Sequence, residues 1–165
     1  EEDLKFSPEH DDTADELVFH FLRVFNNELP TKRYYGSDEE IYGKKEYWAS
    51  AKETITKYHN GERKIMDCDH VMILVYSCLY YLHNDKFPEE KWRLRGFIVD
   101  LWGNLGGHAL LGWVRGGDVN DFVPLETTFM DEKQGFMWTK KYRIRNQLFY
   151  QIRYSFDNEN EYVRL

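Results

Sequence analysis

The chain has 165 residues, of which 42% are hydrophobic and 17% aromatic, and its formal net charge at pH 7 is -7. This length and apolar content are enough for one domain that buries a core without disulfides or metal ions. The negative charge argues against nucleic acid and against an anionic membrane surface as partners, because both repel an acidic chain. We therefore expect a single domain over residues 1–165, with no nucleic-acid partner and no membrane partner.

The first elements in chain order are predicted to be helical. The acidic residues 1–12 are expected to be loose, and residues 13–25 carry a broad apolar face behind a capping residue, Asp12 or Thr13. Residues 27–45 contain one proline, two glycines and a charge cluster, which indicate a surface connection. That connection is expected to carry Tyr34 and Tyr35 toward the cleft.

Two further helices follow in the sequence. The pattern Ser50-x-x-Glu53 is a capping box and predicts a short helix that ends at Tyr58. Residues 71–82 are apolar on every side of a helical wheel, which is typical of a buried central helix and too short to cross a bilayer. This helix is predicted to run from Cys68 to about His83.

Cys68 is placed by this pattern in the first turn of the central helix. Asp67 before it is a favourable N-cap, and the positive end of the helix dipole favours the thiolate form of a cysteine at that position. The second cysteine, Cys78, would lie about 15 Å further along the same helix, which is too far for a disulfide. Cys68 is therefore a candidate nucleophile, and Cys78 is expected to be a core residue.

Strand patterns fill the second half of the chain. Residues 84–88 are predicted to form a turn and residues 91–101 a strand. Residues 106–114 and 120–128 then form a hairpin around Gly116-Gly117-Asp118, and residues 142–156 form one or two more strands before a turn at 157–160. Helices followed by hairpins indicate an α+β fold, in which the cysteine-bearing helix packs on an antiparallel sheet.

The hairpin carries a histidine on one arm and an acid on the other. If its loop holds an odd number of residues centred on Gly117, His108 lies opposite Glu126 and the two side chains share one face. A two-residue loop would instead place Leu125 opposite His108. A thiol at a helix start, an imidazole to accept its proton and a carboxylate to orient the imidazole together form a catalytic triad.

The order of these motifs resembles the transglutaminase-like superfamily of papain-type cysteine enzymes, including its small microbial and viral members. The matching motifs are Asp67-Cys68-Asp69 at the start of an apolar helix, Gly107-His108-Ala109, and Glu126-Thr127-Thr128. The resemblance spans roughly residues 47–128, includes the segment 48–54, and implies a core domain of about 47–156. It implies that Cys68 is the nucleophile, His108 the base and Glu126 the orienting acid.

The sequence departs from the pattern of this superfamily at two positions. The acid is more often aspartate than glutamate, and a longer carboxylate can still accept a hydrogen bond from imidazole. The residue after His-Ala is more often tryptophan than leucine, so Leu110 bears on substrate specificity more than on the reaction.

Trp48 has two interpretations. It can be a core aromatic that anchors the short helix, or its indole N–H can donate to the oxyanion, a role that the resemblance implies for an aromatic residue upstream of the cysteine. In the second case the backbone N–H of Cys68 is the other donor.

Other candidate sites are less favoured by the sequence. Asp67, Asp69, His70 and Asp100 could be metal ligands, but neighbouring side chains at a helix start are expected to splay apart, and no Cys or His pair has zinc spacing. Residues 103–107 lack the Lys-Ser/Thr ending of a phosphate loop and are expected to form a turn. The histidines other than His108 are expected to be structural or exposed. We therefore expect no metal and no cofactor.

Three functions remain open from the sequence. The favoured one is a cysteine-dependent hydrolase that cleaves an amide or peptide bond in a protein or peptide substrate through a thioester. The second is a transglutaminase, in which a lysine amine replaces water as the acceptor. The third is a binding module that has kept the fold and lost the reaction. Because no secretory signal segment opens the chain, a cytoplasmic protein is expected.

Overall fold

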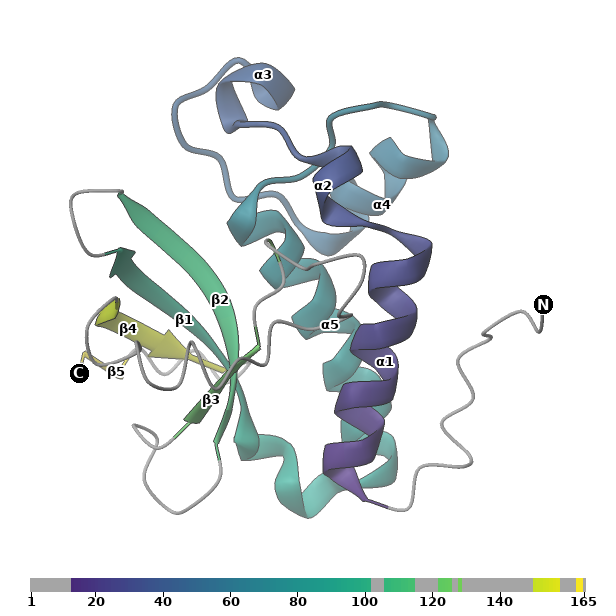
Figure 1. Ribbon diagram of the computed structural model, residues 1–165, viewed down its shortest axis with the longest axis vertical. Helices are drawn as coiled ribbons and strands as arrows, with labels where there is room; N and C mark the ends of the chain where they lie inside the picture. The colour runs from purple at the N-terminus through teal and green to yellow at the C-terminus, as the bar shows by residue number, and fades with distance from the viewer. Residues whose placement is uncertain are drawn as a thin grey trace.

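The computed structural model describes residues 13–101, 106–114, 122–125, 128, 150–157 and 163–164. Helices pack against an antiparallel sheet, which confirms the predicted α+β class (Figure 1). The helical elements are α1 (Ala14–Glu28), α2 (Thr31–Tyr34), α3 (Asp38–Tyr42), α4 (Ala51–His59), α5 (Cys68–Lys86) and the 3-10 helix η2 (Pro88–Arg93). The strands are β1 (Leu94–Leu101), β2 (Gly107–Val114), β3 (Phe122–Leu125), β4 (Tyr150–Phe156) and β5 (Val163–Arg164).

The sheet has the strand order β3-β2-β1-β4-β5, and every paired neighbour is antiparallel. One face contributes Ala109, Leu111 and Trp113 of β2 to the main core beneath the helices. The opposite face holds a second cluster, in which the rings of Phe97 and Phe122 stack with centroids 3.9 Å apart. A side chain at Gly112 would enter this stack, since its Cβ would lie 2.3 Å from the Phe97 ring.

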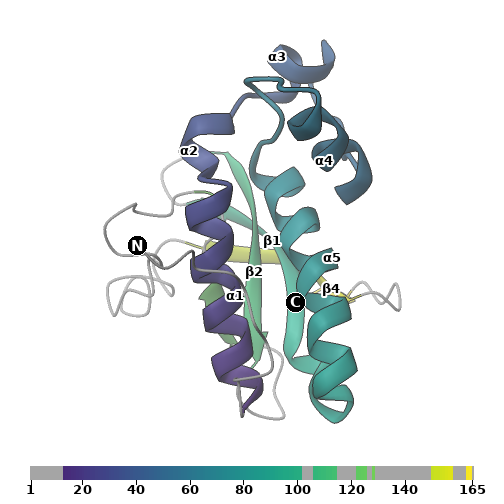
Figure 2. The same ribbon diagram turned by 90° about the vertical axis from the view of Figure 1, so that its right-hand side faces the viewer.

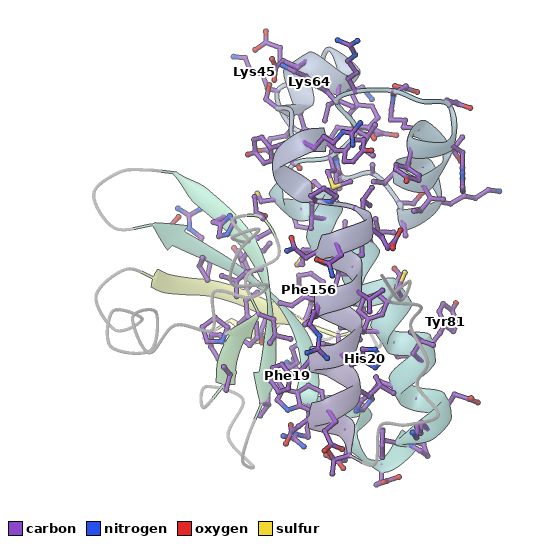
Figure 3. All side chains as sticks on the ribbon, turned by 45° about the vertical axis from the view of Figure 1, so that its right-hand side comes forward. Phe19, His20, Lys45, Lys64, Tyr81 and Phe156 are labelled. Atoms are coloured by element: carbon purple, nitrogen blue, oxygen red, sulfur yellow. The ribbon has the colours of Figure 1, made fainter. Side chains whose placement is uncertain are left out.

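Helix α5 is the centre of the helical layer. It runs beside α1 on one face of the sheet (Figure 2), and side chains such as Val71, Met72 and Leu79 are completely buried. Tyr81 is 74% exposed and points away from the sheet (Figure 3). The expectation of a helix buried on all sides is therefore wrong, because the sheet and the neighbouring helices leave one side of its C-terminal half open.

Capping interactions fix where the N-terminal helices begin. Thr13 caps α1, and Ser50 with Glu53 forms the predicted capping box of α4. The segment 27–45 is more than the predicted surface connection, because it contains α2 and α3. A further capping box, Ser37 with Glu40, starts α3. Helices α2, α3 and α4 gather around the N-terminal end of α5, as Figures 1 and 2 show.

The boundary between α5 and the sheet differs from the prediction. Helix α5 continues past His83 to Lys86, and Pro88 then begins η2, so β1 starts at Leu94 and not at residue 91. Proline is favoured in the first turn of a helix, where its missing N–H leaves no bond unmade. The Arg93 side chain holds η2 in place by donating from Nε to the Val114 carbonyl oxygen at 2.8 Å.

Among the described residues, no helix combines the length and the apolar character that crossing a membrane requires.

His83 joins α5 to the sheet in the core and gives the fold a dependence on pH. Its ring is fully buried and meets the Trp113 ring edge-on at a centroid distance of 5.2 Å. Burial lowers the pKa of His83 below its ordinary value of 6.5. The unfolded chain therefore binds a proton at a higher pH than the folded protein does, so this contribution to stability is present above pH 6.5 and lost as the pH falls from there toward the lowered pKa.

We expect His83→Gln to make the acid-side loss of stability shallower, although it also loses packing at neutral pH. The measurement is the urea midpoint on both sides of the ordinary histidine pKa. His59→Gln is the matched control, because His59 is exposed. An equal acid-side loss in the parent and in His83→Gln would contradict the assignment.

Candidate active site

Cys68 is the first residue of α5, as predicted, and Asp67 is its N-cap. Both cysteines are free thiols and both are half-buried. Both pack against the main core, but they differ in position, because Cys78 lies in the middle of α5. Burial raises the pKa of the Cys78 thiol, which disfavours its thiolate. Of the two, only Cys68 lies at a helix N-terminus, where backbone N–H groups stabilise an anion.

Carboxylates flank Cys68 on both sides in the sequence. Ligand atoms of Asp67, Cys68 and Asp69 lie within 4.8 Å of one another. Burial, and then the adjacent Asp67 carboxylate, raise the pKa of Asp69 to about 9. Asp69 is therefore protonated at neutral pH and can donate a hydrogen bond to Asp67, which lowers the negative charge beside the thiol.

Asp38 is a functional candidate that the sequence analysis missed. It is the first residue of α3, it is 4% exposed, and its Oδ2 accepts a hydrogen bond from the Tyr47 N–H at 2.6 Å. Burial raises the pKa of Asp38, and the Tyr47 hydrogen bond opposes this rise. The capping box of Ser37 and Glu40 is the sequence signal that would have placed a helix, and an aspartate at its start, within the supposed connection.

His70 connects Asp38 to the start of α5. Its Nε2 lies 2.5 Å from the carbonyl oxygen of Tyr47 and 3.5 Å from Asp38 Oδ1, while Nδ1 lies 3.2 Å from Asp67 Oδ1. Ligand atoms of Asp38, Asp67 and His70 are all within 4.8 Å of one another, so the expectation that these side chains splay apart is wrong. Asp67 and His70 are three residues apart and share a helix face, and α3 brings Asp38 to them. Asp100 lies elsewhere, paired with Arg153 at 2.5 Å.

Tyr35 lies beside the cysteine end of α5. A parallel bridge pairs it with Met66, and the Gly36 N–H donates to the Met66 carbonyl oxygen at 3.0 Å. Its side chain is 43% exposed. Burial, followed by the charges of Cys68 and Asp67, raises the pKa of Tyr35, so the phenol keeps its proton. This agrees with the expectation that the connecting segment carries a tyrosine toward the site.

Tyr34 is packed against another aromatic ring, whereas Trp48 is exposed to solvent. Tyr34 packs edge-on against Tyr58, with ring centroids 5.6 Å apart. Trp48 is 51% exposed, so its interpretation as a core aromatic is wrong. Its role as an oxyanion donor stays a prediction.

His108 lies on β2 and is 4% exposed. It pairs with Val99 on β1, so its side chain is on the sheet face of Val99 and Leu110, opposite to that of Ala109. The hairpin pairs Leu111 with Leu125. The predicted centre at Gly117 would have paired Leu111 with Val123, so the predicted register is wrong by two residues.

A shift of two residues preserves the face of each side chain. Even-numbered positions of β2 and β3 therefore still share a face, as the pairing of Gly112 with Pro124 shows. Glu126 follows directly after β3 but lies outside the described residues, as do Trp102 to Leu105 and Gly116-Gly117-Asp118.

Comparisons with known proteins define the class of fold. No protein-family model matches the sequence, and no curated protein matches it. Solved structures do match, and they show which fold the chain shares.

The matching structures are of LapG from Legionella pneumophila. One has a TM-score of 0.54 at 15% sequence identity and covers 93% of this chain and 70% of that chain. A calcium-bound LapG structure has a TM-score of 0.53 at 17% identity, with 91% and 80% covered. An EGTA-treated one has a TM-score of 0.55 at 13% identity, with 93% and 73% covered. At these identities the similarity shows the fold alone.

Proposed function

We propose that this protein is a cysteine-dependent hydrolase of amide or peptide bonds, with a protein or peptide as substrate. The observation that carries the proposal is the position of Cys68, a half-buried free thiol on the first residue of the central helix. The similar fold of LapG, a transglutaminase-like cysteine protease, supports the same reaction class. His108 and Glu126 complete the proposed triad, which requires the His108 side chain to reach Cys68 from the sheet face opposite the main core.

The proposed reaction has two steps. The Cys68 sulfur attacks the substrate carbonyl carbon after its proton moves to His108, and His108 then gives that proton to the departing amine as the C–N bond breaks. Water next attacks the resulting thioester, with His108 accepting its proton, and the acid product leaves as the thiol re-forms. Glu126 orients the imidazole and stabilises its protonated form.

The oxyanion of each step needs hydrogen-bond donors. The backbone N–H of Cys68 is one, because an N–H in the first turn of a helix has no acceptor within that helix. The Trp48 indole N–H is the proposed second donor. Both groups belong to segments at the N-terminal end of α5.

Selective alkylation tests the nucleophile before a substrate is known. Iodoacetamide at mildly acidic pH should modify Cys68 faster than Cys78, on the order of tenfold or more, since only Cys68 lies at a helix N-terminus. Peptide mapping of the parent, Cys68→Ala and Cys78→Ala chains measures both rates. Equal rates at the two thiols would contradict an activated Cys68.

A panel of peptide amides then tests the reaction itself. Release of the amine with formation of a free acid supports hydrolysis. Incorporation of an added primary amine into the acyl product in preference to water would assign the chain to transglutaminases instead. Cys68→Ala is the control for both measurements.

The calcium-bound LapG structure raises the question of whether this chain also holds calcium. Calcium takes six to eight oxygen ligands. The described residues beside Cys68 offer three carboxylates, from Asp38, Asp67 and Asp69, and the other possible ligands are an imidazole nitrogen of His70 and the Cys68 sulfur. This set does not fit calcium, and no step of the proposed reaction involves a metal ion.

A further inference from the structure

In the described part of the chain, three carboxylate oxygens at the N-terminal end of α5 are buried without hydrogen-bond partners: Asp38 Oδ1, Asp67 Oδ1 and Asp69 Oδ2. Among the described residues, no N–H or hydroxyl group donates to these atoms, and all three are inaccessible to solvent. The proton held by Asp69 can bridge Asp69 to Asp67, but it leaves Asp38 Oδ1 without a donor from the described residues. A buried carboxylate oxygen is costly unless a donor or a cation compensates it. One carboxylate oxygen of Asp38, one of Asp67 and a ring nitrogen of His70 lie within 4.8 Å of one another, which is close enough for one ion to contact all three.

The orientation of the His70 ring indicates which nitrogen faces that ion. Nε2 lies 2.5 Å from the Tyr47 carbonyl oxygen, so Nε2 carries the hydrogen and donates it. Nδ1 of the neutral ring then presents its lone pair to Asp67 Oδ1, 3.2 Å away. The Asp67 N–H donates to Nδ1 at 3.3 Å, a long hydrogen bond that an ion on Nδ1 would replace, and Asp67 Oδ1 itself has no N–H or hydroxyl donor among the described residues.

A lone pair facing a carboxylate oxygen is repulsive unless a proton or a metal ion lies between them. Histidines that bind metal ions usually donate their other ring N–H to a carbonyl or a carboxylate, which fixes the tautomer and the ring orientation. The hydrogen bond from His70 to Tyr47 has this form. Tyr47 also holds Asp38, because its N–H donates to Oδ2 at 2.6 Å and leaves Oδ1 for the ion.

The donor types select the class of metal. Imidazole nitrogen suits zinc and other first-row transition metals, whereas calcium prefers oxygen ligands alone. We propose that Asp38, Asp67 and His70 form a binding site for a divalent transition metal ion such as Zn²⁺ or Co²⁺, and that His70 makes this site discriminate against Ca²⁺. The inference goes beyond the proposed hydrolase activity, and binding at this site is measured without a substrate.

Thermal unfolding with added metal ions tests the site. The protein is the full chain carrying Cys68→Ala, which removes the neighbouring thiol as a competing ligand. Zn²⁺ and Co²⁺ should each raise Tm by several degrees, because an ion that binds only the folded state stabilises it. The same concentration of Ca²⁺ should leave Tm unchanged. Bound Co²⁺ should also give a visible absorption band.

Variants of the proposed ligands test whether the metal-dependent Tm shift arises at this site. Asp38→Asn keeps the shape of the side chain and should abolish the Tm shift and the cobalt band. Asp85→Asn, the same change at an exposed aspartate near the other end of α5, should leave both intact. His70→Asp replaces the nitrogen with oxygen and should confer a Tm shift with Ca²⁺. If that buried substitution does not fold, Asp38→Asn still decides the location.

Three results would overturn the proposal. They are an absence of any shift with Zn²⁺ and Co²⁺, a shift with Ca²⁺ as large as that with Zn²⁺, and a shift that survives Asp38→Asn. Failure of the hydrolase proposal is recognised separately, by equal alkylation of Cys68 and Cys78 in the metal-free parent.

Discussion

Cys68→Ala is expected to abolish amide hydrolysis, with a loss of at least about 10⁴-fold in kcat, because it removes the sulfur on which the proposed thioester forms. Thermal stability should fall modestly, since the side chain is half-buried and packs against the main core. The measurement is product formation under single-turnover conditions once the peptide-amide panel has given a substrate, with Tm recorded for the same preparation.

Cys78→Ala is the matched control, because it removes a thiol from the same helix. It should keep full turnover and lose a similar amount of stability, since both thiols are half-buried and pack against the main core. Turnover in Cys68→Ala that equals turnover in Cys78→Ala would remove Cys68 from the reaction.

Glu126→Gln is expected to lower kcat by orders of magnitude, up to about 10⁴-fold, while the fold and the thiol are kept. An amide in place of the carboxylate neither stabilises the protonated imidazole nor holds the correct tautomer. His108→Ala should be at least as damaging, because it removes the base itself. Glu126→Asp should be milder, although the shorter side chain must reach about one bond further and some activity should be lost.

The pattern across these three variants separates the role of the acid from that of the base. If Glu126→Gln retains turnover within a few-fold of the parent while His108→Ala does not, Glu126 is not the orienting acid. Asp118 and Asp121 on the same hairpin are then the next residues to replace. If His108→Ala also retains turnover, the base must be another group.

Local patterns in the sequence predicted where helices begin, because a helix start depends on residues that are close together in the chain. Asp67 followed by Cys68 and an apolar run placed the start of α5, and Ser50 with Glu53 placed the start of α4. A cap joins residues three positions apart, so its signal is complete within one turn of the chain. The α+β class followed in the same way from the order of helical and strand patterns.

Interactions between distant segments could not be predicted from those patterns. The hairpin register is an example, because Leu111 pairs with Leu125 for reasons of packing across the sheet and not of loop symmetry. The end of α5 is another, since Arg93 binds the carbonyl oxygen of Val114 and so holds residues 88–93 in a 3-10 helix.

The site beside Cys68 also combines features set by consecutive residues with contacts between distant segments. The sequence by itself determined the helix, its cap and the cysteine on its first residue, because all three are properties of consecutive residues. Only the tertiary structure brought Asp38 to His70 and Tyr35 to Met66, since these contacts join segments separated by about thirty residues of chain. Consecutive residues thus set the position of the thiol on its helix, whereas tertiary packing determined which polar groups surround it.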